Sequence, residues 1–222
     1  MIESGFMNSP MNIIVIMVLL GLLPIALTLV TSYIKIIVVT NLVRNALGVQ
    51  QVPPGSVLAG LSIILSIFVM APVGQQTYRL LEKEDLSANF TPTQLMTVMS
   101  NVSDPLKTFL VKNTDRRVSN SFTGVARRIW PNEIKDKFED DSFIFIVPSF
   151  VISELTKAFQ IGFLLYLPFI VIDLIISNIL LAMGMMMVSP MTISLPFKLM
   201  LFVSLDGWLK ISQGLLLSYN YT

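Results

Sequence analysis

The sequence predicts an all-α membrane protein, in which about four long apolar helices, kinked by proline, form hairpins on either side of a polar helical insert. Apolar residues make up 54% of the 222 residues and charged residues only 13%, whereas soluble domains carry about 25% charged residues. The charges are also unevenly placed, because 20 of the 29 lie within residues 79–141. Two apolar stretches therefore flank one polar stretch, and the insert falls between the second and third apolar helices.

Four segments approach the roughly 20 apolar residues that a helix needs to cross a bilayer. Residues 13–34 and 56–73 predict an N-terminal hairpin, joined by a short connection at residues 35–55. Residues 158–182 and 191–217 predict a second hairpin at the C-terminal end. Prolines in or beside these segments leave backbone carbonyl groups without a hydrogen-bond donor. Lipid tails cannot supply a donor, so we expect the helices to pack against other protein.

The chain divides into three expected domains, with boundaries at the changes in charge. Residues 1–78 hold the first hairpin, residues 79–141 the polar insert and residues 142–222 the second hairpin. The insert contains helix-like stretches at residues 93–102 and 104–117.

The basic residues of the short connection indicate how the chain is oriented. Lys35 and Arg44 lie there without an acidic residue, whereas the insert has no net charge. Because cytoplasmic loops of membrane proteins carry an excess of Lys and Arg, this favours a cytoplasmic connection and, in a bacterium, a periplasmic insert. Residues 1–12 lack the basic start and the cleavage site of a signal peptide, so we expect them to be retained.

Residues 183–190 predict the loop that closes the second hairpin, because Gly184 and Pro190 break helices. The alternative is one continuous helix through this segment.

The methionines of this segment are Met183, Met185, Met186 and Met187. Methionine is flexible and adapts to irregular surfaces, and a hydrophobic constriction resists ion flow by dewetting. Several copies of such a loop around one axis could close a wide pore, yield to a passing unfolded chain and reseal behind it.

Several charges lie in or beside the apolar segments, where a charge at mid-membrane costs about 2.5–3.5 kcal/mol. Glu154 and Lys157 are three residues apart and share a helix face, and Asp173 lies further along the same segment. One interpretation is a proton or ion relay through a buried, titrating Asp173. The other is pairing between helices or between subunits, which the absence of histidine favours.

Composition removes most catalytic chemistry. The chain has no Cys and no His, so disulfides, thiol nucleophiles and a histidine general base are excluded. We expect no metal, no cofactor and no enzymatic activity. The net charge of +1 also provides no electrostatic footprint for a nucleic acid.

Three stretches carry a resemblance to a known family. They read LVRNALGVQQVP at residues 42–53, SELTKAFQIGF at residues 153–163 and MGMMMVSP at residues 183–190. These motifs resemble the FliP/SctR family, whose members are core export-apparatus subunits of bacterial type III secretion systems. The resemblance covers most of the chain apart from about residues 82–140. Ser189, where flagellar members tend to have proline, favours the virulence-type injectisome branch over the flagellar one.

The resemblance implies a pentamer that also contains smaller partner subunits of the FliQ/SctS and FliR/SctT types. It further implies contacts with larger export-gate and autoprotease-type export subunits. The complex would admit unfolded proteins in transit at the bacterial inner membrane and project to the periplasmic side. Much of the apolar surface would then be buried between subunits, with membrane lipid around the rest.

Carried over by motif, the resemblance implies that Met183, Met185, Met186 and Met187 form a methionine gasket inside the pore. It also implies buried or inter-subunit polar contacts at Arg44, Glu154, Lys157, Asp173 and Lys198. The expected function is therefore a pore-forming structural subunit of the export gate. The alternative is a small secondary transporter that uses Asp173 as its coupling site, although the two apolar halves lack the shared motif of an internal repeat.

Overall fold

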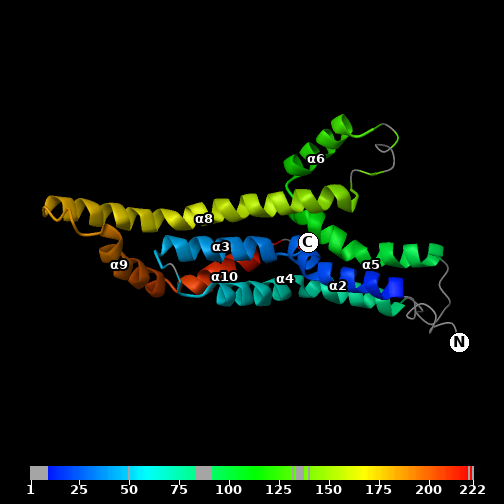
Figure 1. The fold of residues 1–222 in the computed structure, drawn as a ribbon, viewed down its shortest axis with the longest axis horizontal. Helices are drawn as coiled ribbons and strands as arrows, with labels where there is room; N and C mark the ends of the chain where they lie inside the picture. The colour runs from blue at the N-terminus through cyan, green and yellow to red at the C-terminus, as the bar shows by residue number, and fades with distance from the viewer. Residues whose placement is uncertain are drawn as a thin grey trace.

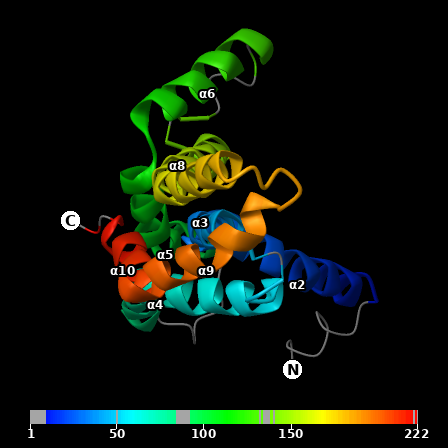
Figure 2. The same cartoon turned by 90° about the vertical axis from the view of Figure 1, so that its left-hand side faces the viewer.

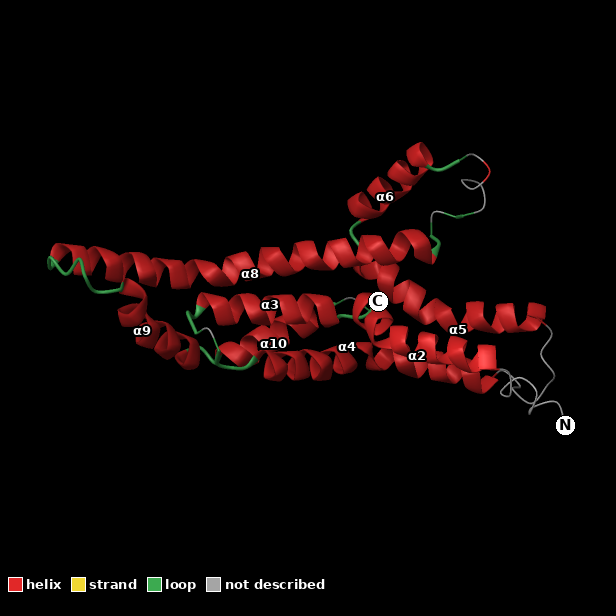
Figure 3. Cartoon of the chain, in the orientation of Figure 1, coloured by secondary structure: helices red, strands yellow, loops and turns green. Residues whose placement is uncertain are grey.

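The computed structural model describes residues 10–49, 51–83, 92–131, 133, 138–139, 141–219 and 221. This part of the chain is helical and contains no strand, which confirms the predicted all-α class (Figure 3). Its helices are α2 (Pro10–Val30), α3 (Tyr33–Ala46), α4 (Gly55–Lys83), α5 (Pro92–Asn113), α6 (Arg116–Ile129), α8 (Phe143–Ala182), α9 (Pro190–Ser204) and α10 (Gly207–Leu217). The expected tail at residues 1–12 lies mainly outside the described residues, as does part of the insert.

Helix α8 runs along most of the length of the molecule (Figure 1) and organises the fold. Its 40 residues correspond to about 60 Å at about 1.5 Å per residue. Helix α3 packs along α8 on one side and along α4 on the other, so it lies between two longer helices (Figures 1 and 2). Helix α6 is turned away from this body and packs against α8 only near its base (Figure 1).

The third apolar segment is longer than predicted. We predicted residues 158–182, but α8 begins at Phe143 and continues through Pro148 and Pro168. The charged pair Glu154 and Lys157 marked the expected edge of the segment. Glu154 is instead fully buried and paired, so the apolar helix continues past it.

The first apolar segment is two helices rather than one. Helix α2 ends at Val30 and α3 begins at Tyr33, so the predicted helix over residues 13–34 is broken. The break contains Ser32, a residue type that favours helix ends over helix interiors. Its hydroxyl donates to the hydroxyl of Ser66 on α4 at 3.1 Å, which fixes the break against a neighbouring helix.

The predicted connection at residues 35–55 is wrong, because most of it belongs to α3. Lys35 is fully buried in this helix rather than exposed in a loop. Its ammonium pairs with the carboxylate of Glu154 inside the protein. A buried, paired lysine does not indicate which side of the membrane is cytoplasmic. The orientation that we predicted from Lys35 and Arg44 loses this support.

The fourth apolar segment is sharply bent. Helices α9 and α10 meet at an angle of 59°, where Asp206 takes a left-handed conformation with a φ of 51°. A Cβ at Gly207 would lie 2.3 Å from the ring of Phe202, so only glycine allows this close return of the chain. The predicted continuous helix over residues 191–217 is therefore wrong.

Among the described residues, α4 and α8 are each long and apolar enough to cross a membrane, and the bent α9–α10 pair adds a third if it counts as one span. The expected count of four is thus confirmed only in part. Helix α4 extends to Lys83, past the predicted boundary at residue 78. Helix α5 includes Pro105 and spans the gap between the two predicted stretches of the insert.

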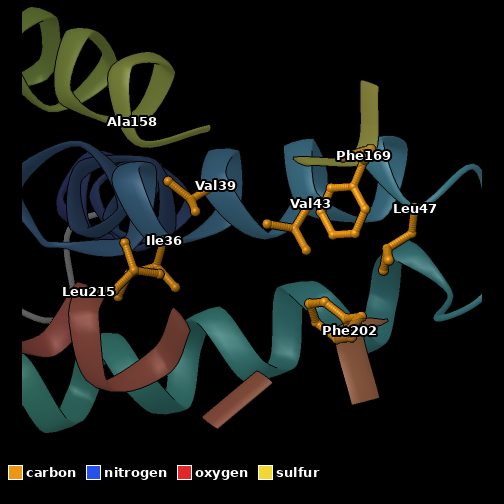
Figure 4. Close-up of a cluster of buried hydrophobic side chains, with 9 residues drawn as sticks. Ile36, Val39, Val43, Leu47, Ala158, Phe169, Phe202 and Leu215 are labelled. Carbon is orange, nitrogen blue, oxygen red and sulfur yellow. The ribbon is translucent and has the colours of Figure 1, made fainter. Parts of the chain in front are cut away.

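Among the described residues the core forms two apolar clusters, one along α3 and one where α4, α5 and α8 meet. In the first, Val43 of α3 and Leu47, the residue after α3, lie near Phe169 of α8 and Phe202 of α9 (Figure 4). The second gathers side chains of α4, α5, α8 and the segment after α10: Val69, Val73, Phe109, Leu110, Ile146, Phe150 and Tyr219. The first cluster packs α8 against α3 and α9, in the half of the molecule that carries the methionine-rich segment.

Candidate functional site

The methionine-rich segment is the turn between α8 and α9. Gly184 follows the end of α8 in the left-handed conformation, with a φ of 74°. The backbone N–H of Met185 donates to the carbonyl of Leu180 at 2.9 Å, and that of Gly184 donates to the carbonyl of Leu181 at 3.0 Å. Together these bonds form a Schellman motif, a common helix ending that satisfies the last carbonyls. Backbone hydrogen bonds therefore fix how the chain leaves α8.

The turn ends where α9 begins at Pro190. Proline suits the first helical position, because the N–H that it lacks would have no partner there. The backbone N–H of Thr192 donates to the carbonyl of Ser189 at 3.2 Å. The turn thus occupies residues 183–189, at the position predicted for the loop.

The methionines of this turn point away from the rest of the chain. Met187 is 100% exposed and Met186 is 82% exposed, and Met183 and Met185 are also exposed. Figure 1 shows the turn at the far end of α8, beyond the end of α3. Full burial of a methionine side chain is worth about 1.5–3 kcal/mol, so this end of the subunit offers a strong apolar contact to another molecule.

The base of the hairpin is held by three side chains, which we call the hairpin clamp: Asp173 of α8 and Ser194 and Lys198 of α9. The Nζ of Lys198 lies 2.7 Å from Oδ2 of Asp173, and the hydroxyl of Ser194 donates to Oδ1 at 2.6 Å. Lys198 also donates to the carbonyl of Ala46, the last residue of α3, at 3.3 Å. Ser194 and Lys198 are buried. The clamp therefore joins α8, α9 and the end of α3.

A second polar cluster surrounds Glu154, which is fully buried in the N-terminal half of α8. Its Oε2 lies 3.3 Å from Nζ of Lys35 and accepts a hydrogen bond of 2.5 Å from the hydroxyl of Tyr219. Its Oε1 lies 3.2 Å from Nζ of Lys157. Lys157 also donates to the backbone carbonyl of Asn113 at the end of α5. One carboxylate thus connects α3, α8 and the C-terminal segment, and through Lys157 it reaches α5.

Sequence reasoning did not include Lys35 or Tyr219 among the candidate residues. The available signal was that Lys35 is the first charge after a long uncharged run. Its ammonium lies 3.5 Å from the centroid of the Tyr219 ring. Burial lowers the pKa of Lys35 from 10.5 to about 8, although the carboxylate of Glu154 acts in the opposite direction. Burial and the charge of Glu154 raise the pKa of Tyr219, so its hydroxyl keeps the proton that it donates.

The five predicted polar residues form two separate ion pairs and one arginine that belongs to neither pair. Glu154 pairs with Lys157 and Asp173 pairs with Lys198, but Glu154 and Asp173 are 19 residues apart on one helix, or about 28 Å. Arg44 joins neither cluster, and its buried Nε has no hydrogen-bond partner among the described residues. Asp173 is bound by both Ser194 and Lys198, which disfavours a role as the coupling site of a transporter.

Large apolar side chains also cover the outer faces of α4 and α8. On α4, Ile64 and Phe68 are 66% and 69% exposed. On α8, Phe159, Phe163 and Leu164 are each more than half exposed. Contiguous apolar surface of this kind indicates contact with protein or lipid. Within the described residues, no three acidic side chains gather to form a metal site.

Comparison with known proteins identifies what the chain is similar to. It matches the model of the FliP family over residues 16–215, a range that contains the hairpin clamp and the methionine turn. It is 50% identical over 212 residues to Yop proteins translocation protein R of Yersinia pestis, which covers 94% of this chain and 96% of that protein. It is 46% identical over 210 residues to the Hypersensitivity response secretion protein HrcR of Ralstonia nicotianae, covering 94% and 97%. It is 47% identical over 204 residues to the Virulence protein YscR of Salmonella typhimurium, covering 90% and 93%.

Proposed function

Because the chain belongs to the FliP family and is a component of a type III secretion apparatus of the injectisome type, we propose that it is a pore-forming subunit of the export gate. In this role it passes unfolded proteins across the bacterial inner membrane and performs no chemical step. Its methionine turn is the seal of that pore.

The single observation that carries this proposal is the exposed methionine turn at the end of α8. Met186 and Met187 are among the most exposed apolar side chains of the described residues, on a turn whose backbone is held by a Schellman motif. A rigid turn that presents flexible apolar side chains suits a contact that must fit closely and yield. Copies of the turn around one axis would bury one another's methionines and exclude water from the gap, which resists ion flow.

The apolar faces of α4 and α8 support an assembly rather than an isolated subunit. Side chains such as Phe68, Phe159 and Phe163 are left exposed in the single chain and would be covered by neighbouring subunits or by lipid. We propose that the neighbours are four further copies of this chain, together with FliQ/SctS-type and FliR/SctT-type subunits. The larger export-gate and autoprotease-type subunits would adjoin this assembly, which would project to the periplasmic side of the inner membrane.

The experiment that tests the seal is the ion conductance of the assembled complex in a planar bilayer. The complex is purified from cells that also express the two small partner subunits, and native mass spectrometry verifies its composition. We expect the variant M185S/M186S/M187S to assemble and to conduct ions in the closed state several-fold better than the wild type. The matched control is Met200→Ser, which changes a methionine that is 64% exposed on α9 outside the turn and should stay tight. An assembled triple variant with wild-type conductance would overturn the seal.

A further inference from the structure

The methionine turn is attached to the rest of the molecule through a narrow base. From residue 181 to residue 187 each side chain is exposed, and a Cβ at Gly184 would meet nothing within 4 Å. The backbone hydrogen bonds of the turn run within residues 179–192. These bonds fix the shape of the turn, but they do not fix its direction relative to α3 and α4.

That direction is set where α9 returns to the body of the molecule. The first residue of α9 that is fully buried is Ser194, and Lys198 follows one helical turn later. Both bind Asp173 across the hairpin. Lys198 then reaches the carbonyl of Ala46 on α3, where a cation is favoured by the orphan carbonyls at a helix C-terminus. One buried ammonium therefore couples both arms of the hairpin to the end of α3.

We propose that the hairpin clamp of Asp173, Ser194 and Lys198 is the positioning device of the pore seal: it holds the α8–α9 hairpin in the direction at which the methionine turn closes the pore. The proposal rests on the proposed function for the meaning of the closed state. The clamp residues do not line the seal. They act through the hairpin, from the base of α9 and from a point more than two helical turns before the end of α8.

The physical reason is that the Lys198 side chain is only 4% exposed and depends on the carboxylate of Asp173, which is 33% exposed, for its counter-charge. Removing one partner leaves an uncompensated charge that is strongly unfavourable in a buried site. With Asp173→Asn, the negative charge is lost and a single amide oxygen replaces the two carboxylate oxygens that accept from Ser194 and Lys198, so the hold between the two arms is weakened. With Lys198→Met, the link to α3 is lost and Asp173 keeps only Ser194. Both changes leave the methionines and the Schellman motif intact.

The test measures the direction of the turn and the tightness of the pore separately. Since the chain contains no Cys, Met187→Cys and Val57→Cys introduce two unique sites for spin labels, both on exposed positions. Pulsed dipolar spectroscopy on the full chain in detergent then gives the distance distribution between the turn and α4. We expect D173N and K198M to shift or broaden this distribution, and D173E to restore it partly because the charge is kept. Asp141→Asn breaks a partly exposed ion pair with Lys107 elsewhere in the chain and should leave the distance distribution unchanged.

The same variants without the cysteines are assembled with the partner subunits, and their closed-state conductance is measured. We expect a several-fold increase for D173N and K198M. If the distance distribution is unchanged in both D173N and K198M, the clamp does not position the hairpin, and the proposal is overturned whatever conductance is measured. A second outcome also overturns the proposal. In it the distance distribution changes and M185S/M186S/M187S conducts more than the wild type, but D173N and K198M keep the wild-type conductance. The clamp would then direct the turn without positioning the seal. If the methionine variant itself stays tight, the proposed function fails, and the distance measurement alone then decides whether the clamp directs the turn.

Discussion

The hydroxyl of Tyr219 donates a hydrogen bond of 2.5 Å to Oε2 of Glu154, 65 residues earlier in the chain. This contact brings the end of the chain back to the longest helix. The ring of Tyr219 also lies over the ammonium of Lys35 and stacks against Phe109 of α5. One residue outside the matched family region therefore closes the buried polar cluster around Glu154.

Replacing Tyr219 by Phe tests how much this closure contributes. Hydrogen bonds to charged groups are worth about 1.5–3 kcal/mol, so we expect Tyr219→Phe to lower the free energy of unfolding by about this amount and to lower the melting temperature in detergent. The control is Tyr221→Phe, which removes a hydrogen bond from Tyr221 to the uncharged carbonyl of Val69 and should cost less. Equal melting temperatures for Tyr219→Phe and the wild type would contradict the role of this bond.

Lys35 predicts a pH dependence of stability. In the folded chain its pKa is lowered from 10.5 to about 8, mainly by burial. Between these values the unfolded state binds more protons than the folded state, so the free energy of unfolding rises with pH, by on the order of 1 kcal/mol per pH unit. We therefore expect the wild type to gain stability relative to Lys35→Met between pH 8 and pH 10. Thermal unfolding of both proteins in detergent measures the difference, because titrating groups outside the cluster around Glu154 contribute equally to each. Parallel curves for the two proteins would show that Lys35 does not titrate as described.

The contact between α3 and α8 depends on Gly162. A Cβ at this position would lie 2.2 Å from Cδ1 of Leu42 and 3.2 Å from its Cβ, so Gly162→Ala overpacks the interface. Overpacking typically costs about 1–3 kcal/mol. We expect Gly162→Ala to destabilise the chain in detergent, and the double variant G162A/L42A to recover part of the loss because the clashing side chain is removed. If the two changes add without any recovery, the clash with Leu42 is not the cause.

The sequence predicted the features that depend on local signals. Gly184 and Pro190 are helix breakers, and the turn lies between the helices that they end and begin. The spacing of Glu154 and Lys157 predicted a shared face, and the two side chains pair at 3.2 Å. These predictions needed only helix geometry and residue chemistry.

The features that sequence reasoning missed depend on contacts between distant residues. Ser32 is of a residue type that favours helix ends, but a single serine in an apolar run does not locate a break, and here the break is fixed by Ser66 on another helix. Lys35 could not be distinguished from a loop cation until its carboxylate partner was known. The bend at Asp206 brings the ring of Phe202 against Gly207, where an added Cβ would clash. Hydropathy measures composition, whereas each of these features is set by a tertiary partner.

The left-handed conformation of Gly184 is the last feature with a measurable consequence. A side chain at a φ of 74° is strained by about 1 kcal/mol, so Gly184→Ala should weaken the Schellman motif that ends α8. The turn lies at an exposed end of the molecule and can open locally without global unfolding. We therefore expect faster hydrogen exchange at the amide of Met185, with little change in melting temperature.

Gly214 is the matched control, because it lies within helix α10 and an added Cβ there meets nothing within 4 Å. Gly214→Ala should stabilise its helix by about 0.5–1 kcal/mol and leave exchange at Met185 unchanged. Unchanged exchange at Met185 in Gly184→Ala would contradict the role of the Schellman motif in holding the turn.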